Sequence, residues 1–377
     1  MRPISGIHME TVDTAIIGAG AIGLALARTL SADRSVVVLE QENRVGQHLS
    51  SRNSEVIHAG LYYPPGSLKS RLCLAGSKAL YRYCEATGVP YRQCGKLLVA
   101  QKGQEAQLQQ LHDNAEAVGA PALKRLSRTQ WQQQEPWLNA SEVLLSPGSG
   151  IFDSHSLLSQ LQQDAHLNGA LITLCHQVTR IECEPNDYRL LVADSNKQHF
   201  TLRCRQLILA AGLYNTSLLE SAAGFPTDQV PEQRQARGNY FALSGRSPTR
   251  RLVYPMPEAH GLGVHLTVDM ANQARFGPDV EWITPTLPPD YLINAERKST
   301  FVDAVQQYWP DLNPDRLQPS YAGIRPKLYL QNKPLTDFLI QDVGSHGLSG
   351  MINLLGIESP GLTAALAIAE EVKGRLG

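Results

Sequence analysis

The sequence lacks the features of several large protein classes. Its six cysteines are scattered over 377 residues without a C-x-x-C or other close pair, which disfavours a zinc site or a disulfide framework. The 34 basic and 35 acidic residues leave no positive excess that would indicate a nucleic-acid partner. No apolar run reaches the roughly 18 residues of a membrane span, and the N-terminal stretch has no apolar core of a secretory signal. We therefore expect a globular protein of a reducing compartment, without a transmembrane segment.

The composition instead fits a folded chain of two domains. It is 42% hydrophobic and 18% charged, so it can bury a large core. A single core stops growing at roughly 250–300 residues, which is shorter than this chain. The N-terminal pattern predicts strand, helix and strand over residues 12–17, 21–30 and 36–39, which is βαβ order. Further elements follow: a long polar loop over 41–65, helices over 68–87, 103–118, 154–167 and 361–376, strands over 96–100 and 206–211, and a strand meander over 170–203.

The turn after the first strand carries the strongest motif, Gly18-x-Gly20-x-x-Gly23. It opens a helix, and Glu40 ends the next strand at the spacing of a dinucleotide-binding fingerprint. Gly18 permits the tight turn, Gly20 lets the backbone approach a pyrophosphate, and Gly23 lets the helix pack on the strand. Glu40 is expected to accept hydrogen bonds from the adenosine ribose. The motif predicts a bound dinucleotide but does not by itself separate NAD from FAD.

Two further segments indicate a flavin through resemblance. Residues 207–212, LILAAG, resemble the strand end at which flavoproteins pass a small-residue turn close to the dinucleotide. Residues 356–363, GIESPGLT, resemble the C-terminal flavin loop of the D-amino-acid-oxidase-like superfamily. The resemblance implies FAD as cofactor, with this loop and the following helix N-terminus near the flavin ring. A helix N-terminus there would stabilise negative charge on the reduced ring.

A closer resemblance begins in the long loop. Residues 51–69, SRNSEVIHAGLYYPPGSLK, resemble the L-2-hydroxyglutarate dehydrogenase/oxidase family. The sequence departs from that family at Glu55, where a small residue is usual, and over residues 268–272. The resemblance implies oxidation of an L-2-hydroxy acid, above all L-2-hydroxyglutarate to 2-oxoglutarate, by hydride transfer to flavin N5. Further matches follow in the family's order at residues 237–241, 253–257, 261–267 and 322–327.

The same resemblance implies a set of catalytic residues. Arg325 matches the arginine with which relatives clamp a substrate carboxylate, a task suited to the planar guanidinium, although a structural ion pair is the alternative. His58 and His265 are candidate bases for the substrate hydroxyl, with His265 favoured. Most of the eleven histidines of such a chain are structural, so only the motifs single out these two. Tyr254 is a candidate hydrogen-bonding residue of the pocket. Weaker candidates are Tyr62 and Tyr63, and the possible ligands of a second carboxylate Lys69, Arg71 and Lys327, for which solvated charge is the simpler interpretation.

The predicted fold class is α/β, with a discontinuous Rossmann-type FAD-binding domain and an antiparallel-sheet α+β substrate domain. The first is expected over residues 9–88, 151–225 and 331–377, and the second over 89–150 and 226–330. The candidate cofactor-binding residues are Gly18, Gly20, Gly23, Glu40, Ser51, Asn53, Ser54, Val178, Ala211, Gly212, Gly356, Ile357, Glu358, Pro360, Gly361 and Leu362. No metal site is expected.

Two rival functions and the cellular setting complete the expectations. An FAD-dependent amino-acid or amine oxidase would use the same fold, and a non-catalytic flavin-binding protein would hold FAD without turnover. The expected partners are a small 2-hydroxy acid and an electron acceptor, which is a quinone, another carrier or oxygen. A cytoplasmic location is expected, with peripheral contact at the inner face of a membrane left open.

Overall fold

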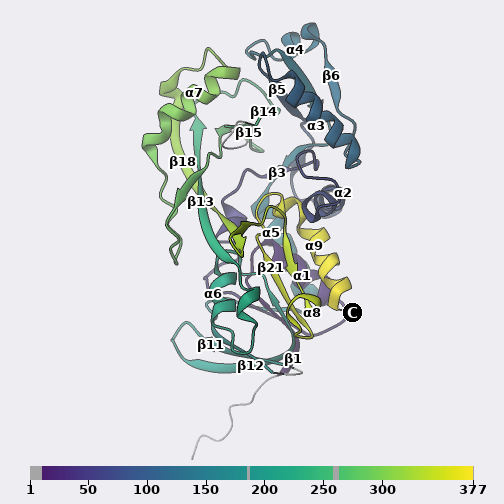
Figure 1. Cartoon of the computed structure of the whole chain (residues 1–377), viewed down its shortest axis with the longest axis vertical. Helices are drawn as coiled ribbons and strands as arrows, with labels where there is room; N and C mark the ends of the chain where they lie inside the picture. Colours follow the sequence, from purple (N-terminus) through teal and green to yellow (C-terminus); the bar gives the residue numbers. More distant parts are fainter. Residues whose placement is uncertain (1–10, 185–186, 258–262, 377) are drawn as a thin grey trace, which may run out of the picture. The chain divides into compact units, whose positions relative to one another are not determined.

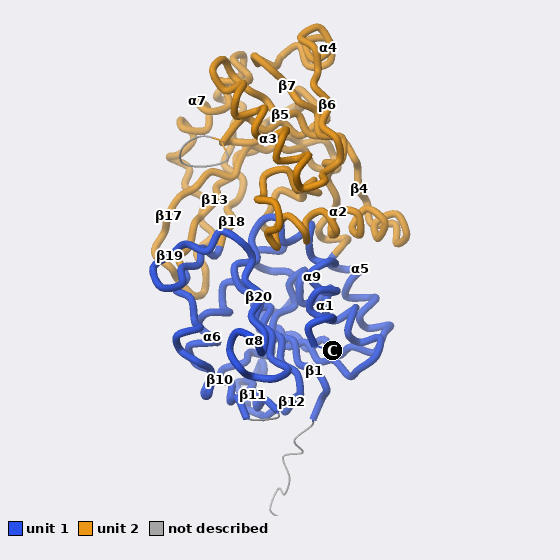
Figure 2. Tube along the Cα trace, turned by 45° about the vertical axis from the view of Figure 1, so that its right-hand side comes forward, with its two compact units in different colours: residues 1–51, 158–233, 326–377 blue, residues 52–157, 234–325 orange. Residues whose placement is uncertain are grey.

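The computed structural model describes residues 11–184, 187–257 and 263–376. The chain divides into two compact units: unit 1 comprises residues 1–51, 158–233 and 326–377, and unit 2 comprises residues 52–157 and 234–325 (Figure 2). Parts of some expectations fall outside the described residues. They are the ends of the first domain at residues 9–10 and 377, residues 185–186 of the expected meander and the first two residues of the 261–267 motif.

A mostly parallel sheet forms the centre of unit 1. Its strands are β1 (Thr11–Ile17), β2 (Val36–Leu39), β9 (Leu171–Thr173), β12 (His199–Leu209), β20 (Leu339–Gln341) and β21 (Met351–Leu355). β1 pairs in parallel with β2 on one side and with β12 on the other, and β9 and β21 continue the sheet outward in parallel. β20 adds an antiparallel edge strand beside β21. The predicted βαβ unit is confirmed, and its short apolar strands are typical of a parallel sheet buried on both faces.

An antiparallel meander extends this sheet. It consists of β10 (Gln177–Cys183), β11 (Tyr188–Ala193) and the first half of β12. Tyr188, Leu190 and Val192 alternate into the core of unit 1, whereas the residues between them are partly exposed. This period of two is the pattern from which strands were expected in this stretch, and the meander is confirmed from β10 onward. Its first expected strand, β9, instead pairs in parallel with β2.

Helices cover the sheet of unit 1. The described helices that begin or lie in this unit are α1 (Ala21–Leu30), α6 (Asn215–Glu220), α8 (Val343–His346) and α9 (Gly361–Leu376), and α5 (Ser154–Leu167) enters it at residue 158. α1 and α9 pack side by side (Figure 1). Both are rich in alanine, and small side chains let two helix backbones approach closely. Two elements far apart in the sequence thereby pack against each other.

A larger sheet forms the centre of unit 2. Its strands follow the order β19-β18-β13-β16-β15-β14-β5-β7-β6, with β17 beside β13. β5 and β14 pair in parallel, whereas β5 with β7 and β14 with β15 pair antiparallel. The expectation of a wholly antiparallel sheet is corrected at this pair, because β14 arrives from a distant part of the chain and not through a hairpin. The bounds are β5 (Lys96–Ala100), β6 (Lys124–Leu126), β7 (Glu142–Ser146), β13 (Glu232–Leu243), β14 (Leu252–Pro255), β15 (Leu266–Val268), β16 (Ala274–Phe276), β17 (Glu281–Ile283), β18 (Leu317–Leu330) and β19 (Lys333–Pro334).

Helices and a small sheet complete unit 2. They are α2 (Leu68–Thr87), α3 (Glu105–Ala117), α4 (Arg128–Gln134), α7 (Lys298–Tyr308), β3 (Val56–Ile57), β4 (Tyr91–Arg92) and β8 (Gly150–Phe152). α2 begins where the Ser67 hydroxyl accepts the Ser70 N–H and ends at Gly88 in the left-handed conformation. The core is aromatic at its centre, where the Phe241 and Phe301 rings lie 4.6 Å apart.

The units divide the chain differently from the expected domains. Residues 52–88 were assigned to the FAD-binding domain, but they belong to unit 2. Local contacts explain the difference: β3 pairs with β8, the Asn114 side chain donates to the carbonyl oxygen of Leu61, and the Tyr81 hydroxyl donates to that of Gly148. The identification of either unit as a cofactor or substrate domain remains a prediction.

Candidate functional site

The glycine turn of unit 1 closes around Glu40. The backbone N–H of Ala19 donates to Glu40 Oε2 at 2.6 Å, and that of Glu42 donates to Oε1 at 2.9 Å. Burial raises the pKa of the Glu40 carboxyl, and the two backbone donors oppose that rise. Glu40 therefore holds the turn in place, and each of its oxygens keeps a second lone pair for a ligand.

Each position of the motif requires glycine for a different steric reason. Gly18 has a φ of +102°, and a Cβ there would lie 2.7 Å from the carbonyl oxygen of Ala210. A Cβ on Gly23 would run into the carbonyl oxygen of Gly18. A Cβ on Gly20 would meet only the Ser50 hydroxyl, at 3.0 Å. The first and third glycines thus serve the packing of the turn, whereas the second leaves open space beside the backbone.

That open space belongs to a cavity of about 400 Å³ in unit 1. The cavity lies at the carboxyl ends of β1, β2 and β12, the edge at which open α/β sheets bind ligands. The first turn of α1 lines it and presents the positive end of the helix dipole. The predicted cofactor-binding residues that line it are Gly18, Gly20, Glu40, Val178, Ala211, Gly212 and Ile357.

Other predicted cofactor-binding residues take different positions. Gly23 lies behind the turn, and the Ser51 hydroxyl donates to the Gln47 carbonyl oxygen at 3.0 Å. Asn53 and Ser54 belong to unit 2, where the Ser54 hydroxyl bonds that of Tyr240 at 2.9 Å. In the C-terminal loop, Glu358 forms an ion pair with Lys327 at 2.7 Å, which accounts for that lysine. Only Ile357 of that loop lines the cavity, and the loop residues outside its lining are Gly356, Glu358, Pro360, Gly361 and Leu362.

Several cavity residues were missed from the sequence. The Ser50 hydroxyl accepts the N–H of Ala21 at 2.9 Å and so caps the first turn of α1. His48 lies beside Tyr214, with ring centres 5.6 Å apart, and both line the cavity. The available signal was the glycine- and serine-containing loop after Glu40, which was expected only as a long functional loop.

A second group of polar side chains lies inside unit 2. His265 and Tyr254 stack with ring centres 3.5 Å apart and an angle of 10° between the rings, and both are buried. On β5, the side chain of Lys96 places its Nζ 4.0 Å from the centre of the Tyr254 ring. His58 is half-buried beside this group, and the charges of Lys96 and His265 act on it. We name Lys96, Tyr254, His265 and His58, together with Tyr62, the lysine cluster.

The environment of the lysine cluster changes its acid–base properties. Burial lowers the pKa of Lys96 to about 7. The His58 pKa lies well below its ordinary value, because the ring is withdrawn from water and the positive charges of Lys96 and His265 add to that effect. The lowered pKa favours the neutral imidazole of His58, which is the form that can accept a proton. The structure brings together His58, His265 and Tyr254, which the sequence had named separately, and adds Lys96, which it had not.

Arg325 lies at the end of β18 that belongs to unit 2. Its Nη2 donates to the carbonyl oxygen of Asp279 at 2.6 Å. A Cβ on Gly238 would collide with the guanidinium, so the glycine makes room for this arginine. Tyr240 interacts electrostatically both with Arg325 and with Tyr254. Both groups therefore lie within electrostatic range of the same buried tyrosine.

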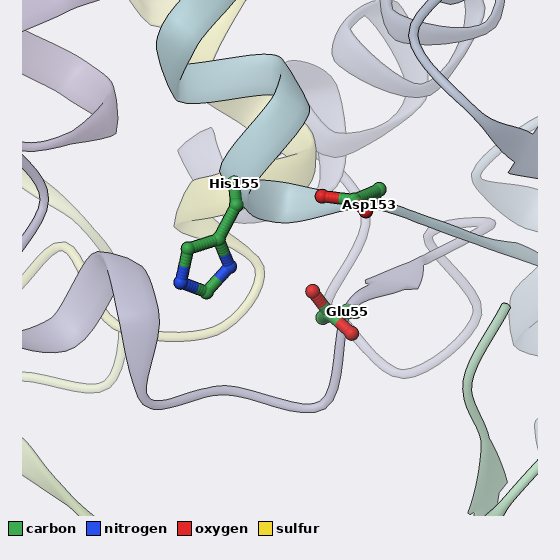
Figure 3. Close-up of side chains that lie close together, drawn as sticks. All are labelled: Glu55, Asp153 and His155. Carbon is green, nitrogen blue, oxygen red and sulfur yellow. The ribbon is translucent and has the colours of Figure 1, made fainter. Parts of the chain in front are cut away.

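A group of potential metal ligands is explained by helix capping. Glu55, Asp153 and His155 face one another with ligand atoms within 4.8 Å (Figure 3). Glu55 accepts the backbone N–H of Ser154 at 3.1 Å and its hydroxyl at 2.7 Å, and Asp153 accepts the N–H of Ser156. Both carboxylates thus hold the first turn of α5. This cap also gives a structural reason for Glu55, the residue at which the sequence departs from the family it resembles.

Comparisons with known proteins assign the fold. A family model described as FAD dependent oxidoreductase (DAO) matches residues 13–375. The chain is 39% identical to a protein of Arabidopsis thaliana named "L-2-hydroxyglutarate dehydrogenase, mitochondrial", over all of this chain and 86% of that protein. The human protein of the same name is 27% identical, over 99% and 92% of the two chains. Among solved structures, L-alpha-glycerophosphate oxidase of Mycoplasma pneumoniae with FAD bound has a TM-score of 0.87 at 27% identity, covering 98% and 95%.

These findings bear on the expected location. The prediction of a cytoplasmic protein is wrong by this comparison, because the curated relatives are named mitochondrial. The sequence features behind that prediction, scattered cysteines and no apolar N-terminal run, do not distinguish one reducing compartment from another. Within the ranges that the structure describes, no helix has the length and apolar character needed to cross a membrane.

Proposed function

The chain belongs to the family of FAD-dependent oxidoreductases, and from that premise we propose that it oxidises L-2-hydroxyglutarate to 2-oxoglutarate. The observation that carries the substrate is the 39% identity, over the whole chain, to a relative named for this activity. In the reaction the secondary alcohol carbon loses a hydride and its hydroxyl loses a proton. When bound, FAD supplies the hydride acceptor. The rest of the chemistry belongs to side chains of this protein.

The residues of the cavity in unit 1 fit a dinucleotide. The backbone at Gly20 is open to a pyrophosphate, and the first turn of α1 offers N–H groups and a positive dipole end. The Glu40 carboxylate stands at the end of β2 with lone pairs for ribose hydroxyls. We propose that Ala211, Gly212 and Ile357, which line the cavity, contact the part of FAD beyond the pyrophosphate and the adenosine ribose.

Substrate binding and deprotonation are assigned to unit 2. Arg325 would pair with one carboxylate of the substrate through its planar fork of N–H groups. His265 or His58 would accept the hydroxyl proton on a ring nitrogen, which makes hydride departure from the carbon easier. The neutral state of His58 and the stacking of His265 on Tyr254 support a fixed base in this cluster. The electron acceptor that reoxidises the enzyme is proposed to be a quinone, another carrier or oxygen.

The test is reduction of the FAD-loaded protein in the absence of oxygen. We expect L-2-hydroxyglutarate to bleach the flavin absorbance, and the D enantiomer and the 2-amino acid L-glutamate to leave it oxidised at the same concentration. Bleaching by amino acids alone would replace the proposal with an amine oxidation. Bound FAD that no compound of the panel reduces would point to a non-catalytic flavin protein. Addition of a quinone, or of oxygen, to the reduced enzyme then identifies the acceptor by its reoxidation rate.

A further inference from the structure

Lys96 is a buried ammonium-bearing side chain without a counter-ion. It is 1% exposed and sits at the start of β5, between β14 and β7. No carboxylate of the described residues forms an ion pair with it, and none of them accepts a hydrogen bond from its Nζ within 3.5 Å. A buried charge in folded proteins is almost always paired, because removal from water is costly. An unpaired buried lysine therefore indicates a position that an anionic ligand completes.

The surroundings of Lys96 contain a second unused donor. Its Nζ lies 5.7 Å from the centre of the Tyr62 ring, and the Tyr62 hydroxyl is buried without a hydrogen-bond partner among the described residues. Buried polar atoms without partners are rare in folded proteins. An ammonium and a phenol on neighbouring buried side chains, both lacking an acceptor, suit a ligand group with two acceptor oxygens.

Lys96 and the proposed base His265 lie on opposite sides of the Tyr254 ring, so they would contact different ends of a ligand. His265 stacks on Tyr254 at 3.5 Å between ring centres, and Lys96 Nζ lies 4.0 Å from the same ring centre. Two groups this close to one ring centre cannot share a face, so they lie on opposite faces of Tyr254. A hydroxyl at His265 and an anion at Lys96 would thus belong to different ends of one small molecule.

We propose that Lys96, with the Tyr62 hydroxyl, binds the carboxylate of the substrate that is remote from the oxidised carbon, and so makes the enzyme specific for dicarboxylic 2-hydroxy acids. The inference rests on the proposed function and adds the group that reads the second carboxylate. Arg325 takes the other carboxylate, next to the reacting carbon. The sequence had named Lys69, Arg71 and Lys327 for this second carboxylate, and Lys327 is engaged by Glu358 in unit 1.

The acid–base state of Lys96 gives the site a recognisable response to binding. Burial holds its pKa near 7, and the titratable groups that face it are Cys73, Cys94, His58, Tyr62 and Tyr254. None of these is a carboxylate. A bound carboxylate favours the ammonium form, so the pKa of Lys96 rises when the ligand enters. Above pH 7 a dicarboxylate therefore binds together with a proton, whereas a monocarboxylate of the same length does not.

The first experiment compares substrates that differ only at the remote end. L-2-hydroxyvalerate replaces the remote carboxylate of L-2-hydroxyglutarate with a methyl group. We expect the FAD-loaded wild type to prefer the dicarboxylate by about 10²–10³-fold in kcat/KM, the size of effect seen when one partner of a buried charge pair is removed. In Lys96→Met the preference should fall below about tenfold, because kcat/KM for the dicarboxylate should fall further than kcat/KM for L-2-hydroxyvalerate. Tyr62→Phe should lose about tenfold on the dicarboxylate alone, and the exposed Lys102→Met should match wild type.

The second experiment needs no variant. Calorimetric titration of 2-oxoglutarate into the oxidised FAD-loaded protein at pH 8, in two buffers of different ionisation enthalpy, should show uptake of close to one proton. 2-Oxovalerate should bind weakly and without uptake. A Lys96→Met protein that keeps the dicarboxylate preference, or one that loses both substrates equally with FAD retained, overturns the proposal. A wild type that oxidises neither acid refutes the proposed function, whereas proton-coupled binding of 2-oxoglutarate would still support the anion site.

Discussion

At the scale of single residues, Arg325 illustrates a side chain whose geometry matters more than its charge. Its guanidinium donates to the Asp279 carbonyl oxygen and fits beside Gly238, where any side chain would collide with it. Arg325→Lys keeps the charge but replaces a fork with one point donor. Loss of one charge-assisted hydrogen bond lowers kcat/KM for L-2-hydroxyglutarate by about 10–100-fold. FAD content should stay unchanged, with the exposed Arg246→Lys as control. Unaltered kcat/KM would assign Arg325 a structural role.

The two histidines of the lysine cluster make a second prediction at this scale. His58→Gln and His265→Gln keep hydrogen bonding but cannot take a proton. The variant that lacks the base should reduce flavin about 10²–10⁴-fold more slowly at neutral pH. The pKa of His58 lies below its ordinary value. If His58 is the base, the rate of flavin reduction in the wild type should therefore not begin to fall until the pH is well below the ordinary pKa of a histidine. Stopped-flow flavin reduction across pH measures both effects, and parent rates in both variants would exclude these histidines.

At the scale of elements, the β1–α1 turn separates two kinds of glycine. Gly20→Leu fills the open space beside the turn, so the protein should fold but purify with little FAD, as absorbance after acid release would show. Gly23→Ala forces a Cβ against the Gly18 carbonyl oxygen and should lower the melting temperature as well. Full FAD occupancy in Gly20→Leu would mean that the cofactor binds elsewhere.

The elements also explain what the sequence could and could not predict. The turn, α1 and Glu40 are close in sequence, so spacing alone predicted that they meet. Lys96 could not be found this way, because a lysine at the start of the run KLLVA looks like a solvated strand end. Its burial results from β14, which arrives from about 150 residues further along and pairs with β5. Ser50 was missed for the same reason, since its hydroxyl meets Ala21 only after the long loop has folded back.

At the scale of the whole molecule, similar long-range pairing decided the unit boundaries. Residues 52–88 follow the dinucleotide motif directly and were therefore expected beside it. Their hydrogen bonds lead instead to α3 and β8 in unit 2. Unit 1 thus resembles the expected domain in its sheet and its helices, but not in this segment. Its other boundaries differ as well, since residues 151–157 belong to unit 2 and residues 226–233 and 326–330 belong to unit 1. A sequence motif can indicate the chemistry of a segment. The unit to which the segment belongs depends on its pairing with residues far away in the sequence, which a local pattern does not show.

The same scale carries a prediction about folding stability. The pKa of Lys96 is about 7 in the folded protein against 10.5 as the reference for an exposed lysine, so the unfolded chain binds the proton more tightly. Burial of the ammonium lowers the free energy of unfolding. This destabilisation is largest below pH 7, decreases as the pH rises from about 7 toward 10.5, and is absent above that range. Its upper limit is about 5 kcal/mol, since each unit of pKa corresponds to about 1.4 kcal/mol.

Lys96→Met removes this cost, so it should be more stable than wild type at pH 6.5, and the difference should narrow steadily by pH 9. Denaturant unfolding of both proteins at matched pH gives the difference directly, and subtraction cancels the titration of groups that do not interact with Lys96. Glutarate should stabilise the wild type at pH 6.5 more than it stabilises Lys96→Met, because the variant keeps Arg325 for one carboxylate but has lost the ammonium for the other. A stability difference that stays constant from pH 6.5 to 9 would show that Lys96 keeps its ordinary pKa, and that a pre-existing partner already satisfies its charge.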